Sequence, residues 1–166
     1  PKTAEYKGQL ATAWKWIDDK TLELDLRKGV KFHNGAEFTA DDVVYTLNFV
    51  VSPESKVVTR QNVAWIDRAE KIDAYKVRII CKEPFPAAIE YLAGPVVIHP
   101  HEYYAKVGPQ GMNEKPVGSG PYRITEHAVG KFVRMERNPD YFKDSPKLQP
   151  KIEKVEIRFI PDRQTQ

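Results

Sequence analysis

The chain has 166 residues, of which 41% are hydrophobic and 30% charged, a composition typical of one globular domain. Its 26 basic and 23 acidic residues are interleaved and leave a net charge of +3, so we expect no nucleic-acid partner. No run reaches the roughly 18 to 20 apolar residues that span a bilayer, and no signal peptide opens the chain. Because it begins at Pro1 without a start methionine, we interpret it as a processed or excised piece, and export stays possible.

The first pattern predicts an antiparallel hairpin. Residues 9–17 carry Trp14 and Trp16 on one parity, and residues 18–21 supply turn chemistry before an alternating strand at 22–27. Two tryptophans on one face of a strand are typical of a core, so we expect both to pack against the helix that follows.

That helix is predicted from Ala40, at the end of a long linker. Thr39 is suited to cap the first free amides, and Asp42 lies three residues later, where the acid of a capping box belongs. Asp41 and Asp42 also favour the positive end of the helix dipole. Ser52-Pro53 ends the helix, because a proline cannot donate the next amide. Its expected buried stripe is Val43, Leu47, Val50 and Val51.

The middle of the chain predicts a second hairpin and two short helices. Strands at 64–72 and 75–82 turn at Asp73-Ala74, and the second strand places Cys81, the only cysteine, on its buried parity as a structural thiol. A helix is expected from Pro86 to Gly94. Another is expected at 101–107, closed by Gly108 and followed by a loop over 108–117.

The segment 116–122, Pro-Val-Gly-Ser-Gly-Pro-Tyr, invites a phosphate-loop or nucleophile-elbow interpretation. Both motifs need a glycine-rich turn that leads directly into a helix, whereas strand-like runs at 122–126 and 131–137 follow here. We therefore predict a tight turn whose glycines adopt backbone angles that other residues avoid. A last alternating strand is expected over 155–159.

The polar residues give no constellation that favours catalysis or a metal centre. Asp41 and Asp42 are adjacent and are explained by the helix start, so a paired-carboxylate hydrolase is not favoured. His99 and His101 flank Pro100, but two imidazoles without an identifiable third ligand make an incomplete zinc site. We predict that the chain is not an enzyme and uses no metal or cofactor.

Five motifs, in this order, resemble those of the family 5 extracellular solute-binding proteins, the peptide, nickel and opine receptors of ABC transporters. They are Leu10-Ala11 with Trp14, the stretch 26–44, the segment 116–122, Arg137-Asn138-Pro139-Asp140-Tyr141 and Ile160-Pro161-Asp162. Such receptors are two-lobed clamps considerably longer than this chain. The resemblance implies a mixed α+β fold of antiparallel hairpins and short helices. It further implies that residues 1–166 are a single partial domain, the first lobe with its extra subdomain, and that the second lobe is absent.

The resemblance also implies a function and a site. The parent protein would capture a small peptide or similar solute and deliver it to a membrane permease, at the periplasmic or extracellular face of a bacterial membrane, as a monomer. Segments similar to those around Trp65 and around Ala93, Gly94 and Pro95 line the cleft of such receptors, so these four residues are the predicted ligand contacts. Half a clamp should bind peptides weakly or undetectably. The alternative is a free-standing interaction module that recognises a partner through a sheet edge.

Overall fold

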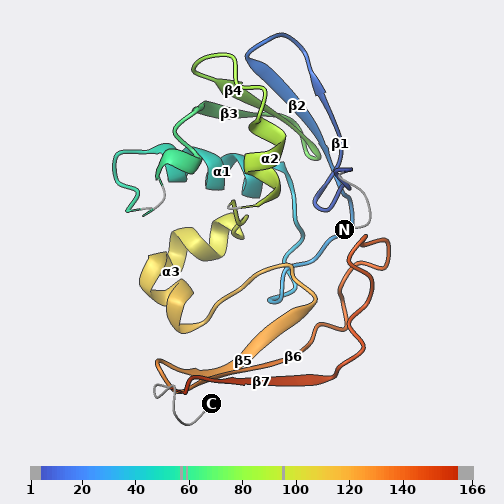
Figure 1. The fold of residues 1–166 in the computed structure, drawn as a ribbon, viewed down its shortest axis with the longest axis vertical. Coiled ribbons are helices and arrows are strands. Elements are labelled where there is room, and N and C mark those ends of the chain that lie inside the picture. Colours follow the sequence, from blue (N-terminus) through green and yellow to red (C-terminus); the bar gives the residue numbers. More distant parts are fainter. Residues whose placement is uncertain (1–4, 57, 59, 95, 161–166) are drawn as a thin grey trace.

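The computed structural model describes residues 5–160 apart from 57, 59 and 95. Its strands form two antiparallel sheets, one ordered β1-β2-β4-β3 and the other β5-β6-β7. Figure 1 shows the sheets at opposite ends of the molecule, with α3 and the segment that follows it between them. The prediction of a mixed α+β fold built from antiparallel hairpins is confirmed. In chain order the elements are β1 (Ala11–Trp16), β2 (Thr21–Leu26), α1 (Ala40–Val51), a 3-10 turn (Arg60–Asn62), β3 (Ile66–Asp73), β4 (Lys76–Cys81), α2 (Ala88–Ala93), α3 (His101–Glu114), β5 (Tyr122–Ala128), β6 (Phe132–Arg137) and β7 (Lys154–Arg158).

Both predicted hairpins form in the four-stranded sheet. β1 pairs with β2 across a turn in which the Asp18 carboxylate accepts a hydrogen bond from the Lys20 amide at 2.9 Å. β3 pairs with β4, and β4 also pairs with β2, so the two hairpins join into one sheet through their inner strands. The turn residues therefore set local pairing, and the apolar parity of β2 and β4 sets how the hairpins combine.

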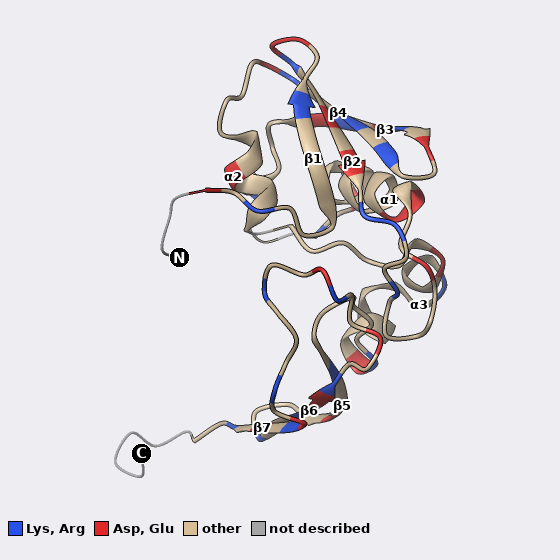
Figure 2. Ribbon diagram, turned by 90° about the vertical axis from the view of Figure 1, so that its right-hand side faces the viewer, with Lys and Arg blue, Asp and Glu red and all other residues tan. Residues whose placement is uncertain are grey.

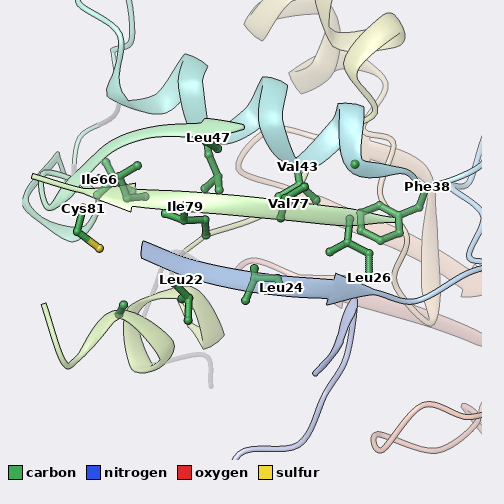
Figure 3. Packing of buried hydrophobic residues seen from close by; sticks show 14 of the residues in the cluster. Leu22, Leu24, Leu26, Phe38, Val43, Leu47, Ile66, Val77, Ile79 and Cys81 are labelled. Carbon is green, nitrogen blue, oxygen red and sulfur yellow. The ribbon is translucent and has the colours of Figure 1, made fainter. Parts of the chain in front are cut away.

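One hydrophobic cluster lies between this sheet and its helices. Figure 3 shows Val43 and Leu47 of α1 directed at Val77 and Ile79 of β4. Leu47 retains only 1% of its exposure, so the predicted apolar stripe of α1 is the side that packs on the sheet. Cys81 is buried as expected, and burial raises the pKa of its thiol.

The start of α1 has the predicted capping box. The Thr39 amide donates to the Asp42 carboxylate at 2.8 Å, and the Asp41 amide donates to the Thr39 hydroxyl at 3.3 Å. The helix ends at the Ser52 cap, before Pro53. Local sequence therefore fixes both ends of α1.

The opposite face of the four-stranded sheet is charged. Glu23 is 5% exposed and accepts from Lys15 at 3.1 Å, Arg78 at 3.0 Å and Lys76 at 3.4 Å. These three cations lower the pKa of Glu23 to about 2. The hydrogen bond from Lys15 has the largest effect, followed by the bond from Arg78. Figure 2 shows basic and acidic residues mixed over both sheets. The charge pattern thus keeps one face of the sheet in water.

The prediction that both tryptophans of β1 are core residues is wrong for Trp16. Its side chain is 37% exposed, whereas Trp14 is half-buried against the cluster. β1 is one edge strand of the sheet, and α1 packs over β3 and β4, which lie towards the opposite edge. The prediction that Trp14 and Trp16 lie on the same face of β1 is therefore right, but α1 does not extend over the end of β1 that carries Trp16.

The predicted loop over 108–117 is also wrong over residues 108–114. α3 runs from His101 to Glu114 with a kink at Gly108, whose φ of 65° and ψ of −173° interrupt the helix. Pro109 can then begin a second helical segment, because a first-turn position needs no amide hydrogen. Gly108 closes the first segment as predicted, but the chain returns to helix instead of leaving it.

The three-stranded sheet has one charged and one apolar face. Arg134 of β6 pairs with Glu156 of β7 at 2.7 Å and with Glu126 of β5 at 2.5 Å. On the other parity, Val133 lies opposite Ile157, which is 46% exposed. The predicted alternating strand at 155–159 therefore forms, with much of its apolar side in contact with solvent. In the described part of the chain, no helix has the length and hydropathy that crossing a membrane requires.

Candidate functional site

A half-open cavity of about 750 Å³ lies between the two sheets. One wall comes from β1, β2, α1 and α2, and the other comes from the segment 116–122 with β5 and β6. Its size and largely apolar lining are those of small-molecule sites in proteins. The apolar side chains of its walls include Trp14, Leu24, Leu26, Phe38, Ile89, Leu92, Val117, Ile124, Met135 and Phe142.

The titratable side chains of the cavity are basic, imidazole or phenolic. Lys7 and Lys147 lie at its exposed edge, and His33 and His99 contribute imidazoles. Among the described residues that line the cavity there is no carboxylate. These lining residues therefore offer no paired carboxylates for acid–base catalysis. An anionic group of a ligand would meet no like charge among them, and an apolar group would meet a largely apolar lining.

The far wall is held by a hydrogen-bond cluster around His33. The His33 amide donates to the Gly118 carbonyl at 2.8 Å, and the Gly118 amide donates to the ring Nδ1 at 3.3 Å. The ring Nε2 lies 3.0 Å from the Gly120 carbonyl, which also accepts from the Asn138 amide group at 3.1 Å. Residues 116–122 are thus a wall segment fixed by backbone contacts, and they do not lead into a helix.

The prediction about the glycines of this segment is wrong. Positive φ angles among the described glycines occur at 29, 35, 108 and 130, and neither Gly118 nor Gly120 is among them. A Cβ added at Gly118 would lie 3.7 Å from the His33 ring. Such a Cβ would make an ordinary van der Waals contact with the imidazole, and the position requires no unusual backbone angle.

The histidines on either side of Pro100 take separate structural roles. His99 stacks on Tyr104 with ring centroids 4.8 Å apart, and burial lowers the pKa of His99. The His101 Nδ1 donates to the Asp42 carboxylate at 2.8 Å, and the His101 amide donates to the same oxygen at 2.9 Å. Within the described residues, no group of three or more His, Cys, Asp or Glu could hold a metal ion.

The structure brings two of the four predicted site residues to the cavity. Ala93 and Gly94, at the end of α2, line it. Trp65 does not: it is 8% exposed, stacks on Phe85 at 5.1 Å, and donates its indole N–H to the Asn62 carbonyl at 3.0 Å. Pro95 lies outside the described residues. The ligand contacts of all four remain predictions.

Sequence reasoning missed Trp14 and His33 as cavity residues. Trp14 was interpreted as core, and only the sheet order shows that its edge strand borders the cavity. His33 lies in the turn beside Asn34, but its partner segment lies 85 residues further along the chain. The large aromatic surface of Trp14, with its polar N–H, is a feature that could have indicated a ligand contact. Nothing in the sequence next to His33 indicates a cavity residue.

Comparison with known proteins places the chain in a family. The model for bacterial extracellular solute-binding proteins, family 5, middle part, matches residues 5–166, so the chain belongs to this family. The oligopeptide-binding protein AppA of Bacillus subtilis is 31% identical over 163 residues, which cover 94% of this chain and 29% of AppA. The recognition made from the five motifs is confirmed, and members of this family are binding proteins.

Solved structures agree with this assignment. The solute-binding protein MoaA of A. tumefaciens R10, in complex with mannopinic acid, matches with a TM-score of 0.84 and 28% identity over 96% of this chain and 32% of its own. AppA of B. subtilis, in complex with a nonapeptide, matches with a TM-score of 0.79 and 31% identity over 95% of this chain and 32% of its own. The chain thus spans about a third of the length of the relatives that it matches.

Proposed function

We propose that this chain is the solute-facing part of an ABC-importer receptor that captures a peptide-like solute and delivers it to a membrane permease. The observation that carries the proposal is the family match over residues 5–166, together with relatives whose names and complexes include an oligopeptide and an opine. Binding in such a receptor involves no covalent chemistry, so an enzymatic role is not part of the proposal.

Residues 1–166 form one partial domain in this account, the first lobe with its extra subdomain. The second lobe lies in the part of the relatives' length that this chain does not match, which is about two thirds of it. Closure of two lobes around a solute is a hinge motion that buries the ligand between them. The complete receptor acts as a monomer at the periplasmic or extracellular side of the membrane.

The cavity is the proposed place where this chain touches the solute. Trp14 offers a large apolar surface with a polar N–H, and Ala93 and Gly94 leave space beside it for a ligand side chain. Trp65 remains a second proposed contact. Because its indole N–H already has a backbone partner, its contribution would be through packing beside α2.

The test is a calorimetric titration of di- and oligopeptides into a polypeptide of the relatives' full length that contains these residues. Trp14→Ala should weaken binding by about tenfold or more, the loss expected for truncating a buried aromatic contact. Trp16→Ala is the matched control, since Trp16 lies on the same strand and face but does not line the cavity, and it should leave affinity unchanged.

Two results would contradict the proposal. Absence of binding to any peptide or opine by the full-length protein would remove the receptor function itself. Equal effects of the Trp14 and Trp16 substitutions would leave the receptor function intact and remove the cavity as its site. The free-standing interaction module would then require a stable partner complex of the 166-residue chain by native mass spectrometry, and no observation in this structure favours it.

A further inference from the structure

One connection between the two sheets across the cavity consists of a turn and the ring of His33. Residues 30–38 form a small hairpin in which the Phe38 amide donates to the Val30 carbonyl at 2.9 Å and the Phe32 amide donates to the Ala36 carbonyl at 2.8 Å. Phe32 is 2% exposed and fully packed, so the position that follows it is fixed. His33 is presented from this tip to the segment that leads into β5.

The ring contacts specify one protonation state. Gly118 donates its N–H to Nδ1, so Nδ1 must keep its lone pair. The Gly120 carbonyl can only accept, so Nε2 must carry the hydrogen. The two bonds can therefore form together only with the neutral imidazole that carries its proton on Nε2. An imidazolium would place a second N–H against the Gly118 N–H, so this bond cannot form with the charged ring.

The surroundings of the ring disfavour the charged form. Burial lowers the pKa of His33, and the nearby guanidinium of Arg123 on β5 lowers it further, while the bond to Gly120 raises it. Glu136 of β6 holds that guanidinium at 2.6 Å. The charged residues of the hairpin itself are Lys31 and Glu37, and the Glu37 carboxylate accepts a hydrogen bond from the Tyr75 hydroxyl. No carboxylate among the described residues lines this side of the cavity to stabilise an imidazolium.

The second connection between the sheets has no group that titrates near neutral pH. The Arg27 guanidinium lies 5.1 Å from the centre of the Phe142 ring, and the Gln9 side chain lies within hydrogen-bond distance of the Ser145 hydroxyl at 3.4 Å. Acidification to about pH 5 leaves these side chains in the same charge state. Of these two connections, the one through His33 is therefore the one expected to respond to mild acid.

We propose that His33 is a pH-sensitive clasp on the wall segment 116–122, because the bond from the Gly118 N–H to Nδ1 forms only with the neutral ring. Protonation releases the Gly118 N–H and loosens the wall of the cavity. The bond from the His33 amide to the Gly118 carbonyl, the bond between Nε2 and Gly120, and the Arg27 contact all remain. The clasp is a conformational device that is independent of which solute the cavity takes, and it would make the cavity wall looser in an acidified compartment.

The test is amide hydrogen exchange of the 166-residue chain, followed by NMR at about pH 7.5 and about pH 5 and expressed as protection relative to the intrinsic rate. Protection at Gly118 should fall by about fivefold or more at the lower pH, the change expected from losing one hydrogen bond. Amides of β2 and β4, which bond to each other in the sheet ladder and make no hydrogen bond to the His33 ring, should keep their protection.

Two variants separate the clasp from general acid sensitivity. His33→Asn retains an acceptor near the Nδ1 position and cannot titrate, so its Gly118 protection should not depend on pH. His99→Gln removes the other imidazole that lines the cavity and should leave the response of Gly118 as in the wild type. A response that persists in His33→Asn, or that disappears in His99→Gln, would overturn the proposal.

The ring itself gives a readout that needs no variant. Nitrogen-15 shifts of His33 should report a protonated Nε2 and a bare Nδ1 at about pH 7.5, and two protonated nitrogens once Gly118 loses protection. If the ring carries its proton on Nδ1 at neutral pH, or if it is protonated without any change at Gly118, the clasp does not exist.

Discussion

Asp42 should be the carboxylate on which the packing of α1 against α3 depends. Its side chain is 3% exposed and accepts three hydrogen bonds, from the Thr39 amide at 2.8 Å and from the amide and ring of His101 at 2.9 and 2.8 Å. Loss of the cap contact costs about 1 kcal/mol. Loss of the charge-assisted contact to the half-buried His101 costs about 2 kcal/mol. Asp42→Ala should therefore lower the free energy of unfolding by about 3 kcal/mol.

Asp41→Ala is the matched control, because Asp41 is the adjacent acid in the same first turn. Its carboxylate is 44% exposed and pairs with Lys71 at 2.7 Å on the surface. A surface pair contributes about 0–1 kcal/mol, and both acids interact alike with the helix dipole. Urea unfolding at neutral pH, analysed with a common m-value, gives the difference between the two variants.

A double-mutant cycle locates the loss. If Asp42 acts through His101, then His101→Ala should cost about 1–2 kcal/mol in the wild type and much less in the Asp42→Ala background. Equal destabilisation by Asp41→Ala and Asp42→Ala would refute the reasoning, since it would leave only the dipole effect. Additive effects of Asp42→Ala and His101→Ala would show that the two side chains are not coupled.

Three further substitutions test the core, the charged face and the kink. Leu47→Ala, at a site with 1% exposure, should cost about 2–5 kcal/mol in urea unfolding, and a cost below about 1 kcal/mol would mean that α1 is not packed on the sheet. Because the cations around Glu23 lower its pKa to about 2, its stabilisation is present above the ordinary value of 4.5 and is lost as pH falls towards about 2. Unfolding measured across that range should therefore show a smaller loss in Glu23→Gln than in the wild type, and equal losses would contradict the ion-pair account. Gly108→Ala, at a φ of 65°, should lower stability by about 1–2 kcal/mol in thermal unfolding, whereas a neutral effect would mean that the kink is not constrained.

Local sequence signals predicted the elements whose ends are set by neighbours in the chain. The box of Thr39 and Asp42 placed the start of α1 at Ala40, and Asp73-Ala74 placed the turn between β3 and β4. In both cases the group that satisfies a free amide is within three residues of it. Such signals are complete in the sequence and do not depend on what packs on the element.

The wrong prediction for Trp16 and the missed cavity both depended on contacts distant in sequence. Nothing within β1 shows that it is an edge strand, so Trp16 had the pattern of a core residue although its side chain is exposed. The cavity has the same origin, because Ala93 and Gly118 come together only through packing of the two sheets. The family resemblance located Ala93 and Gly94, but the cluster of His33 with Gly118 could be recognised only in three dimensions.

The central claim is that these residues bind a peptide-like solute as one part of a two-lobed receptor. The most direct measurement is calorimetric titration of the same oligopeptides into the 166-residue chain and into a polypeptide of the relatives' full length that contains it. The account predicts tight binding by the full-length protein and weak or undetectable binding by the chain alone. Micromolar binding by the 166-residue chain, or no binding by the full-length protein, would contradict it.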